Sequence, residues 1–462
     1  MRNIVLTFAT SLLICALLPA QQKELPPIGG TPKDFVLPDK ESITLDNGIN
    51  LVMIPYGSIP KATIRVAVKT GNIEEDEDQV WLIDLLARLM EEGSTSRSAQ
   101  QLADEMASMG GNLNIGASAH SFSVSSSVLY EFAPDAIRLM ADVLQHPLWP
   151  ESELERLKND MKRDLAVQLS TPQAQAYQAF YTGLYPDHPY GRPYPSEVLL
   201  DSYTTTEIKG FYDDHFGALR TTVYVAGNFD MAAVTNAVKA AFGGWKRGNE
   251  PAFDAGAPVA NPGTKIIDRP GASQSTIYYG LPVIDPSHPD FIAMDVTNSL
   301  LGGSFGSRIT SNIREDKGYT YTPYSVLAEN YRSGLWYQVA DVTTEHTGAS
   351  LEEINKEIAK LRETPPGAEE LEGFQNYESG IFVLQNSTPN GIINQLVFLN
   401  THDLPEEFLQ NRVRNIHALT PEKVQEIAKK YLNPEQMLLI VVGDKAKIES
   451  QIPETIVQPL KQ

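Results

Sequence analysis

The segment SFGSRITSNIREDKGYTY, residues 304–321, combines a short helical pattern with an aromatic strand pattern. Its opening residues are small, and the apolar Ile309 and Ile313 are four residues apart, as on one face of a helix. Gly318 ends this pattern, and the residues that follow it are aromatic and favour a strand. The segment therefore predicts a helix, a tight turn and a strand.

Two polar side chains of this segment are predicted to meet near the turn. Arg314 lies near the end of the predicted helix, and Tyr321 lies at the start of the predicted strand. A guanidinium and a phenol that converge on one point can hold a carbonyl oxygen as it becomes an oxyanion. On its own, an Arg on a helix with a Tyr nearby is more often a solvated charge beside a half-buried ring.

The motifs around these two residues resemble the signature of a known family. They are Ser-Arg-Ile at residues 307–309, Ile-Arg-Glu-x-Lys-Gly at residues 313–318, and a Tyr seven residues after Arg314. Together they resemble the C-terminal-domain signature of the M16 zinc peptidases, the pitrilysin and insulinase-like family, and of the related mitochondrial processing peptidases. In that family the matching Arg and Tyr bind the substrate next to a zinc ion held by the other half of the protein. The resemblance implies the same role for Arg314 and Tyr321.

The order of the predicted elements occurs twice along the chain. A strand at residues 62–66 has a counterpart at residues 275–280. In both copies a Thr, a helix and a strand ending in Gly follow, and the spacing from Thr to Gly is 22 residues from Thr205 and 23 residues from Thr420. The sequence therefore predicts an α+β fold of two duplicated domains that form a clamshell around a central cavity. The M16 resemblance, which covers about residues 43–447, implies the same fold.

The predicted domain boundaries follow from changes in composition. The residues before the first strand are Pro-rich and polar, a hairpin pattern around Asn47-Gly48 opens the folded part, and a later stretch rich in Gly, Pro, Ala and Asn is typical of a linker. The predicted segments are a signal peptide at 1–20, an extended leader at 21–41, an N-terminal M16-like domain at 42–245, a linker at 246–263 and a C-terminal M16-like domain at 264–462.

Several elements of the N-terminal domain have clear local signals. Ser98 and Gln101 predict a capping box at the start of one helix, and two glycines end that helix. A longer helix carries a single apolar stripe. The predicted helices are 79–92, 99–109, 134–144, 151–169 and 206–216, and the predicted strands are 62–68, a pair within 112–129, and 221–226.

The first residues are typical of a secretory signal peptide. Arg2 precedes a largely apolar run at residues 4–18, which is short for a membrane span, and the small Ala20 marks the predicted cleavage point. Ile14 is too bulky for the position before an acylated Cys15, so this cleavage is favoured over a lipoprotein signal. The mature chain would then have no cysteine and no transmembrane segment, and we expect it in the periplasm or outside the cell.

The chain is strongly acidic, with 37 Lys and Arg residues against 58 Asp and Glu residues and a net charge of −21. An acidic surface repels phosphates, so nucleic acid is excluded as a partner. Such acidity is typical of a soluble protein, and a preference for basic partners is a secondary expectation.

The residues that hold zinc in the resembling family are absent. Active members carry His-x-x-Glu-His on the first helix of the N-terminal half, where the two His side chains bind zinc and the Glu activates water. Aligned through the following Gly-Ser, the corresponding residues are Asp84, Ala87 and Arg88, which supply neither imidazole nor base. The i, i+4 spacing of Asp84 and Arg88 predicts an ion pair instead. The family's third ligand, a Glu, aligns near Asp164, which we expect to be a solvated acid.

The sequence contains no other recognisable catalytic motif. None of the eight histidines has His-x-x-x-His spacing. There is no Gly-x-Ser-x-Gly nucleophile elbow, and the Gly-rich residues 303–306 lack the Lys of a phosphate-binding loop. The sequence therefore predicts no metal ion and no cofactor in this chain.

A peptide-binding edge strand is expected after the helix at 99–109. Gly110, Gly111, Asn112 and Asn114 resemble the family's Gly-Gly-x-x-Asn segment, which opens an edge strand that takes substrate by strand addition. A helix C-cap followed by an ordinary strand explains the same residues equally well.

The chain keeps the substrate-side pair of the family and lacks its metal-side residues. Some M16 proteins divide these between two chains, and the resemblance implies a non-catalytic subunit of a heterodimeric zinc metallopeptidase of the bacterial envelope. Arg314 and Tyr321 would complete the active site of a partner that carries His-x-x-Glu-His and the zinc, and the substrate would be a peptide or an unfolded polypeptide. The alternatives are a scaffold that binds peptides without cleaving them and a structural subunit. The sequence leaves open whether the pair serves catalysis or binding alone.

Overall fold

The computed structural model describes residues 33–453 of the chain. The predicted signal peptide, with Cys15 and Ala20, lies outside the described residues, as does most of the predicted leader. From Asp34 onward the described residues form one compact unit. Within it we distinguish a first half, residues 41–245, and a second half, residues 263–453.

The first half contains a six-stranded sheet in the order β1-β2-β6-β3-β5-β4. Neighbouring strands are antiparallel, except that β6 is parallel to β2. The predicted hairpin around Asn47-Gly48 joins β1 to β2, and Gly48 has a φ of +103°, which favours glycine. The strands are β1 (Glu41–Thr44), β2 (Asn50–Pro55), β3 (Lys61–Val68), β4 (Asn114–Ala117), β5 (Phe122–Leu129) and β6 (Thr221–Gly227).

The second half contains a five-stranded sheet in the order β7-β11-β8-β10-β9. Here β11 is parallel to β7, and the other neighbours are antiparallel. Without β1, the first sheet has the same strand order and the same directions, which confirms the predicted duplication. The strands are β7 (Gly263–Asp268), β8 (Gln274–Val283), β9 (Tyr324–Asn330), β10 (Ser333–Thr343) and β11 (Leu438–Gly443).

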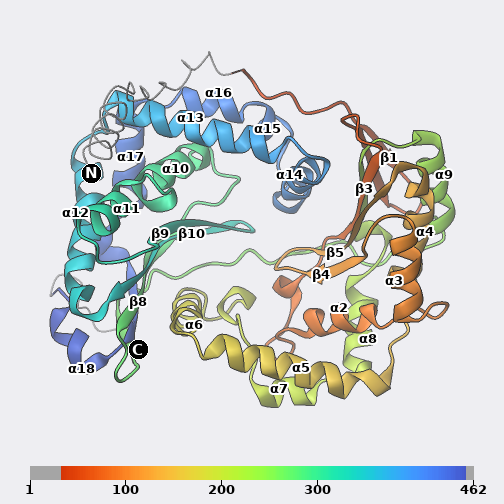
Figure 1. Cartoon of the computed structure of the whole chain (residues 1–462), viewed down its shortest axis with the longest axis horizontal. Coiled ribbons are helices and arrows are strands. Elements are labelled where there is room, and N and C mark those ends of the chain that lie inside the picture. The colour runs from red at the N-terminus through yellow and green to blue at the C-terminus, as the bar shows by residue number, and fades with distance from the viewer. Residues whose placement is uncertain (1–32, 454–462) are drawn as a thin grey trace, which may run out of the picture. The chain divides into compact units, whose positions relative to one another are not determined.

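The helices of the two halves surround these sheets (Figure 1). Within residues 33–453, none of them is long and apolar enough to span a membrane. In the first half they are α2 (Leu82–Glu91), α3 (Ala99–Ser108), α4 (Ala133–Gln145), α5 (Glu151–Leu169), α6 (Pro172–Leu184), α7 (Glu197–Ser202), α8 (Thr205–His215) and α9 (Met231–Phe242). In the second half they are α10 (Phe291–Asn298), α11 (Arg308–Thr310), α12 (Thr347–Glu363), α13 (Ala368–Gln385), α14 (Pro389–His402), α15 (Glu407–Gln410), α16 (Arg412–His417), α17 (Pro421–Tyr431) and α18 (Lys445–Ile448).

The repeat is more regular in the structure than the sequence suggested. Thr204, not Thr205, is the N-cap of α8, and its side chain accepts a hydrogen bond from the backbone of Glu207. Thr420 is the N-cap of α17 in the same way. Counted from these two N-caps, the spacing to the glycine that ends β6 or β11 is the same in both halves.

Each sheet is covered on one face by helices of its own half and on the other face by one helix of the opposite half. Helix α6 packs through Phe180 and Leu184 into a cluster with residues of β8, β10 and β11. Helix α14 packs through Ile392 and Leu396 into a cluster with residues of β2, β3 and β6. Because both of their faces are covered, β6 and β11 are buried along their whole length.

The end of the predicted leader packs against the second half before it enters β1. Phe35 contacts the ring of Phe382 on α13 with a centroid distance of 4.9 Å. Leu37 is buried in the cluster around α14, and Lys40 forms an ion pair with Glu406. These contacts connect residues 34–40 to the second half, while the strand that follows belongs to the first sheet.

Polar contacts also join the halves, next to the half-buried His120 and the buried His402. Lys69 at the end of β3 donates hydrogen bonds to the carbonyl oxygen of Asn400, at 2.8 Å, and to Oδ1 of Asp403, at 2.7 Å. The rings of His120 and His402 lie 6.0 Å apart at this contact. Burial lowers the pKa of His120 to about 3 and that of His402 to about 4. The contact therefore holds both imidazoles in their neutral form near pH 7.

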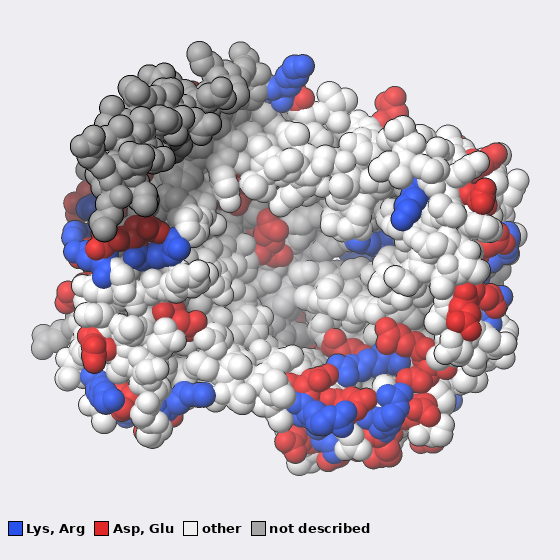
Figure 2. All heavy atoms as spheres, in the orientation of Figure 1, with Lys and Arg blue, Asp and Glu red and all other residues white. Residues whose placement is uncertain are grey.

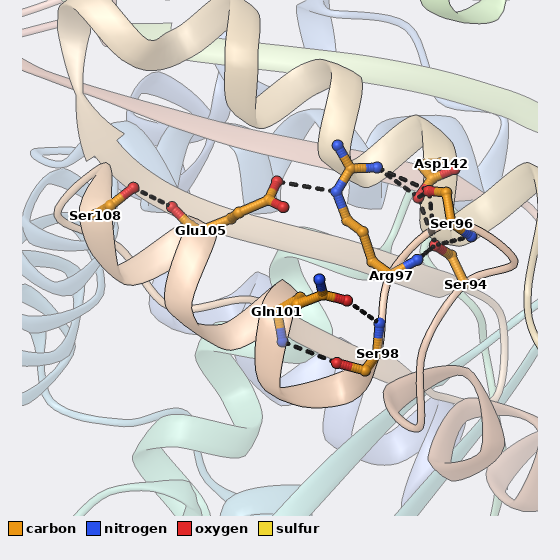
Figure 3. A network of polar contacts seen from close by, with 8 residues as sticks. All are labelled: Ser94, Ser96, Arg97, Ser98, Gln101, Glu105, Ser108 and Asp142. Carbon is orange, nitrogen blue, oxygen red and sulfur yellow. Dashed lines mark hydrogen bonds and ion pairs between the residues drawn. The ribbon is translucent and has the colours of Figure 1, made fainter.

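A polar network fixes α3 against α4 (Figure 3). Arg97 donates to Oε2 of Glu105 on α3, at 2.9 Å, and to Oδ2 of Asp142 on α4, at 2.8 Å. The predicted capping box of Ser98 and Gln101 is present at the start of α3. These contacts set the position of α3 beside the edge strand β4.

Charged side chains of both signs alternate over α5 and α7 (Figure 2). Arg156 of α5, for example, forms ion pairs with Glu92, Glu153 and Asp160. The apolar stripe of α5 lies on the opposite, buried face of the helix. Basic side chains thus neutralise part of the chain's large acidic excess on this surface.

Candidate functional site

Arg314 and Tyr321 lie side by side, as the sequence predicts. The guanidinium carbon of Arg314 is 5.4 Å from the ring centre of Tyr321. The Tyr321 side chain is 80% exposed, so its hydroxyl is available to a ligand. A cation over an aromatic face is attracted by the ring quadrupole, which holds the two groups together.

The local structure around the pair differs in two respects from the predicted helix, turn and strand. Arg314 lies in a π-helix, η6 (Ser311–Asp316), and Tyr321 lies before β9 rather than at its start. Pro323 immediately precedes β9 and has no amide hydrogen to donate, so it separates the ladder of β9 and β10 from an isolated bridge between Thr320 and Val342. Ile309 and Ile313 are fully buried, so the predicted apolar face is confirmed.

Two further residues hold the Arg314 side chain. Its guanidinium carbon lies 4.3 Å from the ring centre of Phe305, so the guanidinium has an aromatic contact in Phe305 as well as in Tyr321. It also forms an ion pair with Glu315. Phe305 is 72% exposed, so its contact with Arg314 lies at the surface. The sequence does not predict this aromatic contact, because no fixed spacing links Phe305 to Arg314.

The positions that align with the zinc ligands carry a different arrangement of charges. Nη2 of Arg88 donates to Oδ2 of Asp164 on α5, at 2.7 Å. Oδ2 of Asp84 accepts a hydrogen bond from Nδ2 of Asn72, at 2.8 Å. The predicted ion pair between Asp84 and Arg88 is therefore wrong, as is the prediction that Asp164 is only solvated. The Arg side chain reaches across from α2 to α5, and a nearby amide takes its place at Asp84.

These side chains do not fit a zinc ion. Zinc in proteins takes three or four nitrogen, sulfur or carboxylate ligands, and a catalytic site also needs a base for its water. Ala87 offers only a methyl group, and Arg88 places a cation against Asp164, the one carboxylate that aligns with a ligand on α5. Among residues 33–453, no group of three or more His, Cys, Asp or Glu side chains is arranged to hold a metal ion.

A buried carboxyl group at the start of α2 was not predicted. Glu75 is 4% exposed and accepts hydrogen bonds from the backbone amides of Trp81, at 3.1 Å, and Ile83, at 2.9 Å. Burial raises the pKa of Glu75 to about 8, and the nearby Asp84 acts in the same direction. In the sequence, Glu75 is one of five consecutive acidic residues, 74–78, and nothing in that run distinguishes the buried one.

The predicted edge strand is present. Among residues 33–453, β4 is the last strand of the first sheet and pairs with β5 alone, so no described strand occupies its other side, which is open to strand addition. Gly110 has a φ of +78°, and a Cβ on Gly111 would lie 2.7 Å from the carbonyl oxygen of Ser127. The backbone therefore favours glycine at both positions, whether or not a peptide binds there. Asn114 is exposed at the start of β4. Whether the glycines, Asn112 and Asn114 also bind a peptide stays a prediction.

Comparisons with known proteins agree with this geometry. Residues 52–195 match the model described as insulinase, peptidase family M16, and residues 202–377 match the model described as the peptidase M16 inactive domain. The chain belongs to the M16 peptidase family. The predicted family and the predicted pair of M16-type α+β domains are thereby confirmed.

Relatives with similar sequences are named zinc proteases. The chain is 23% identical over 405 residues to the uncharacterized zinc protease YmxG of Bacillus subtilis, covering 86% of this chain and 97% of the relative. It is 24% identical over 345 residues to an uncharacterized zinc protease of Rickettsia felis, covering 74% of this chain and 82% of the relative.

Two solved structures share the M16 fold of this chain. A peptidase M16 inactive domain from Pseudomonas fluorescens superposes with a TM-score of 0.80 at 22% identity, covering 88% of this chain and 98% of the other. A protease from Helicobacter pylori superposes with a TM-score of 0.81 at 18% identity, covering 88% of this chain and all of the other. At these identities the likeness concerns the fold.

Proposed function

We propose that this M16 protein is the non-catalytic subunit of a heterodimeric zinc metallopeptidase of the bacterial envelope. Its Arg314 and Tyr321 would bind the peptide at the active site of a partner that supplies His-x-x-Glu-His and the zinc ion. The observation that carries this proposal is the ion pair of Arg88 with Asp164 at the positions of two zinc ligands. With Arg88 bound to Asp164 and with Arg314 still next to Tyr321, the chain keeps the residues that bind substrate in this family and lacks those that bind zinc.

The chemistry divides accordingly between the two subunits. The zinc of the partner would lower the pKa of the attacking water, a step for which residues 33–453 of this chain contain no metal site. Arg314 and Tyr321 would donate hydrogen bonds to the peptide carbonyl as it becomes an oxyanion, and both are held next to each other before the substrate arrives. The free side of β4 would align an extended peptide through backbone hydrogen bonds.

A second candidate function is peptide capture without cleavage, in the periplasm or outside the cell. The free edge of β4 favours it, because strand addition needs no metal and no partner subunit. In that case Arg314 and Tyr321 would stabilise a ground-state carbonyl rather than a transition state. The two candidates differ in whether a zinc-bearing partner is required.

Purification of the native protein from the cell envelope, followed by metal analysis and a peptide cleavage assay, tests the heterodimer. We expect a second M16 chain with zinc, and activity that needs both chains and falls by at least about tenfold with Arg314→Ala or Tyr321→Phe. Matched controls are Arg163→Ala and Tyr130→Phe, exposed residues elsewhere in the first half, which should keep full activity. Peptide binding without any zinc-bearing partner would instead support capture.

A further inference from the structure

A small pocket lies between the end of α2, the helix α3 and the edge strand β4. Its volume is about 210 Å³, and Leu102, Leu113, Ile115 and two alanines of α3 form its apolar walls. Its polar lining comes from Glu91 and Asn112. Sites for whole small molecules are usually larger, roughly 300–1,000 Å³. This pocket therefore suits a single side chain.

A peptide added to β4 would direct side chains toward this pocket. Residues opposite each other on neighbouring strands point to the same face of a sheet. Ile115 is paired with Val124 of β5, a residue of the buried core, so Ile115 points to the face that α2 and α3 cover. A peptide residue paired on the free side with Leu113 or Ile115 would point to that face as well, and would meet the pocket.

Glu91 brings a negative charge to this apolar pocket. The cation closest to it on the same helix is Arg88, whose guanidinium is bound by Asp164, and the neighbouring Glu92 is paired with Arg156. Glu91 itself forms no hydrogen bond or ion pair with the described residues, 33–453. Burial raises its pKa, and Arg88 acts in the opposite direction. Glu91 is exposed at the rim of the apolar walls, and a carboxylate in such a place is stabilised when a cation is placed beside it.

We propose that this pocket selects a lysine or arginine side chain from an extended peptide that adds to β4. The apolar stem of such a side chain would lie along Leu102, Leu113 and Ile115, and its charged end would pair with Glu91. An apolar side chain would fill the pocket but leave Glu91 without a partner, and an acidic one would be repelled. This inference rests on the proposed function, because it requires that β4 receives a peptide.

Binding of labelled peptides to the full mature chain, measured by fluorescence anisotropy, tests the pocket. The probes share an extended Ala/Thr host and carry one lysine, norleucine or glutamate, and the uniform host lets each peptide shift until its guest residue meets the pocket. We expect the lysine peptide to bind about tenfold more tightly than the norleucine peptide, as for a charge-assisted contact. In Glu91→Gln this ratio should fall to within about twofold, while norleucine binding is unchanged.

Two further variants separate this inference from the proposed function. Glu92→Gln, which removes the adjacent acid outside the pocket, should keep the tenfold ratio. Arg314→Ala should weaken all three peptides equally, because it acts on the backbone. Equal binding of the lysine and norleucine peptides by the wild type, or a lysine preference that persists in Glu91→Gln, would refute the proposed selection by the pocket. If Arg314→Ala still weakened peptide binding in that case, the proposed function would stand. If no peptide binds to the chain, both fail.

Discussion

Acidification should weaken the contact between the two halves through His402. This residue of α14 is 4% exposed, and its Nδ1 has no hydrogen-bond partner among the described residues. Burial lowers its pKa to about 4, whereas a histidine in the unfolded chain titrates near 6.5. A folded-state pKa below the unfolded value means that stability is full above pH 6.5 and is lost as the pH falls toward 4.

The size of this effect follows from the two pKa values. Between pH 7 and pH 5 the unfolded chain takes up about 0.7 proton at this site, and the folded protein takes up about 0.1. The resulting loss in the free energy of unfolding is about 2 kcal/mol. His402→Gln removes the titrating group, so the variant should lose about 2 kcal/mol less than the wild type over this range. Titrating groups away from His402 are common to both proteins and cancel in the comparison. The pKa of His120 is lowered mainly by burial and only in part by His402, so His120 is expected to stay neutral over this range in both proteins.

Urea unfolding at pH 7 and pH 5, followed by tryptophan fluorescence, measures this difference. His146→Gln is a matched control, because it makes the same substitution at an exposed residue at the end of α4. If wild type and His402→Gln lost the same free energy between the two pH values, the buried neutral imidazole would be refuted.

Three further predictions concern the candidate site. Glu75→Gln should change the pH dependence of stability in the opposite direction. Because the folded-state pKa of Glu75 is raised to about 8, protonated Glu75 stabilises the fold at low pH, and this stabilisation is lost as the pH rises. In urea unfolding, the free energy of unfolding of the wild type should therefore fall by roughly 2–3 kcal/mol more than that of the variant between pH 5 and pH 7. Phe305→Ala should weaken peptide binding about two- to fivefold by removing an aromatic contact of Arg314, and Phe305→Tyr should restore it; equal affinities in an anisotropy titration would exclude this role. Restoring the family's ligands should create a zinc site, seen as one zinc per chain by metal analysis where the parent chain has none. The required changes are Asp84→His, Ala87→Glu, Arg88→His and Asp164→Glu.

The predictable parts of the fold are those with local signals. The hairpin at Asn47-Gly48, the capping box of Ser98 and the apolar stripe of α5 each depend on residues a few positions apart, and all are present. The duplication was also visible, because the same local patterns occur twice in the same order. The bounds of the predicted helices differ by a few residues at most from the observed ones.

The elements that were not predicted depend on contacts between distant segments. Helix α6 buries Phe180 and Leu184 against the sheet of the opposite half, and α14 does the reverse. No local pattern identifies the surface that receives such a helix. Residues 34–40, at the end of the predicted leader, are similarly positioned by contacts with Phe382 and the cluster around α14 rather than by a local pattern.

The candidate site shows the same division. The convergence of Arg314 and Tyr321 depends on one short segment and was predicted. The bond of Arg88 to Asp164 joins residues 76 positions apart, and it prevails over the local i, i+4 pair with Asp84 because Asn72 already bonds that carboxylate. The burial of Glu75 could not be inferred from a run of acidic residues.

The central claim is that this M16 chain can bind a peptide but cannot activate the water that would cleave it. Zinc titration of the purified mature chain by calorimetry, with peptide hydrolysis measured in the same samples, tests the claim most directly. We predict no stoichiometric zinc binding and no hydrolysis, while a labelled peptide still binds and is released by Arg314→Ala. One tightly bound zinc per chain, lost with Asp164→Ala together with peptidase activity, would contradict the claim.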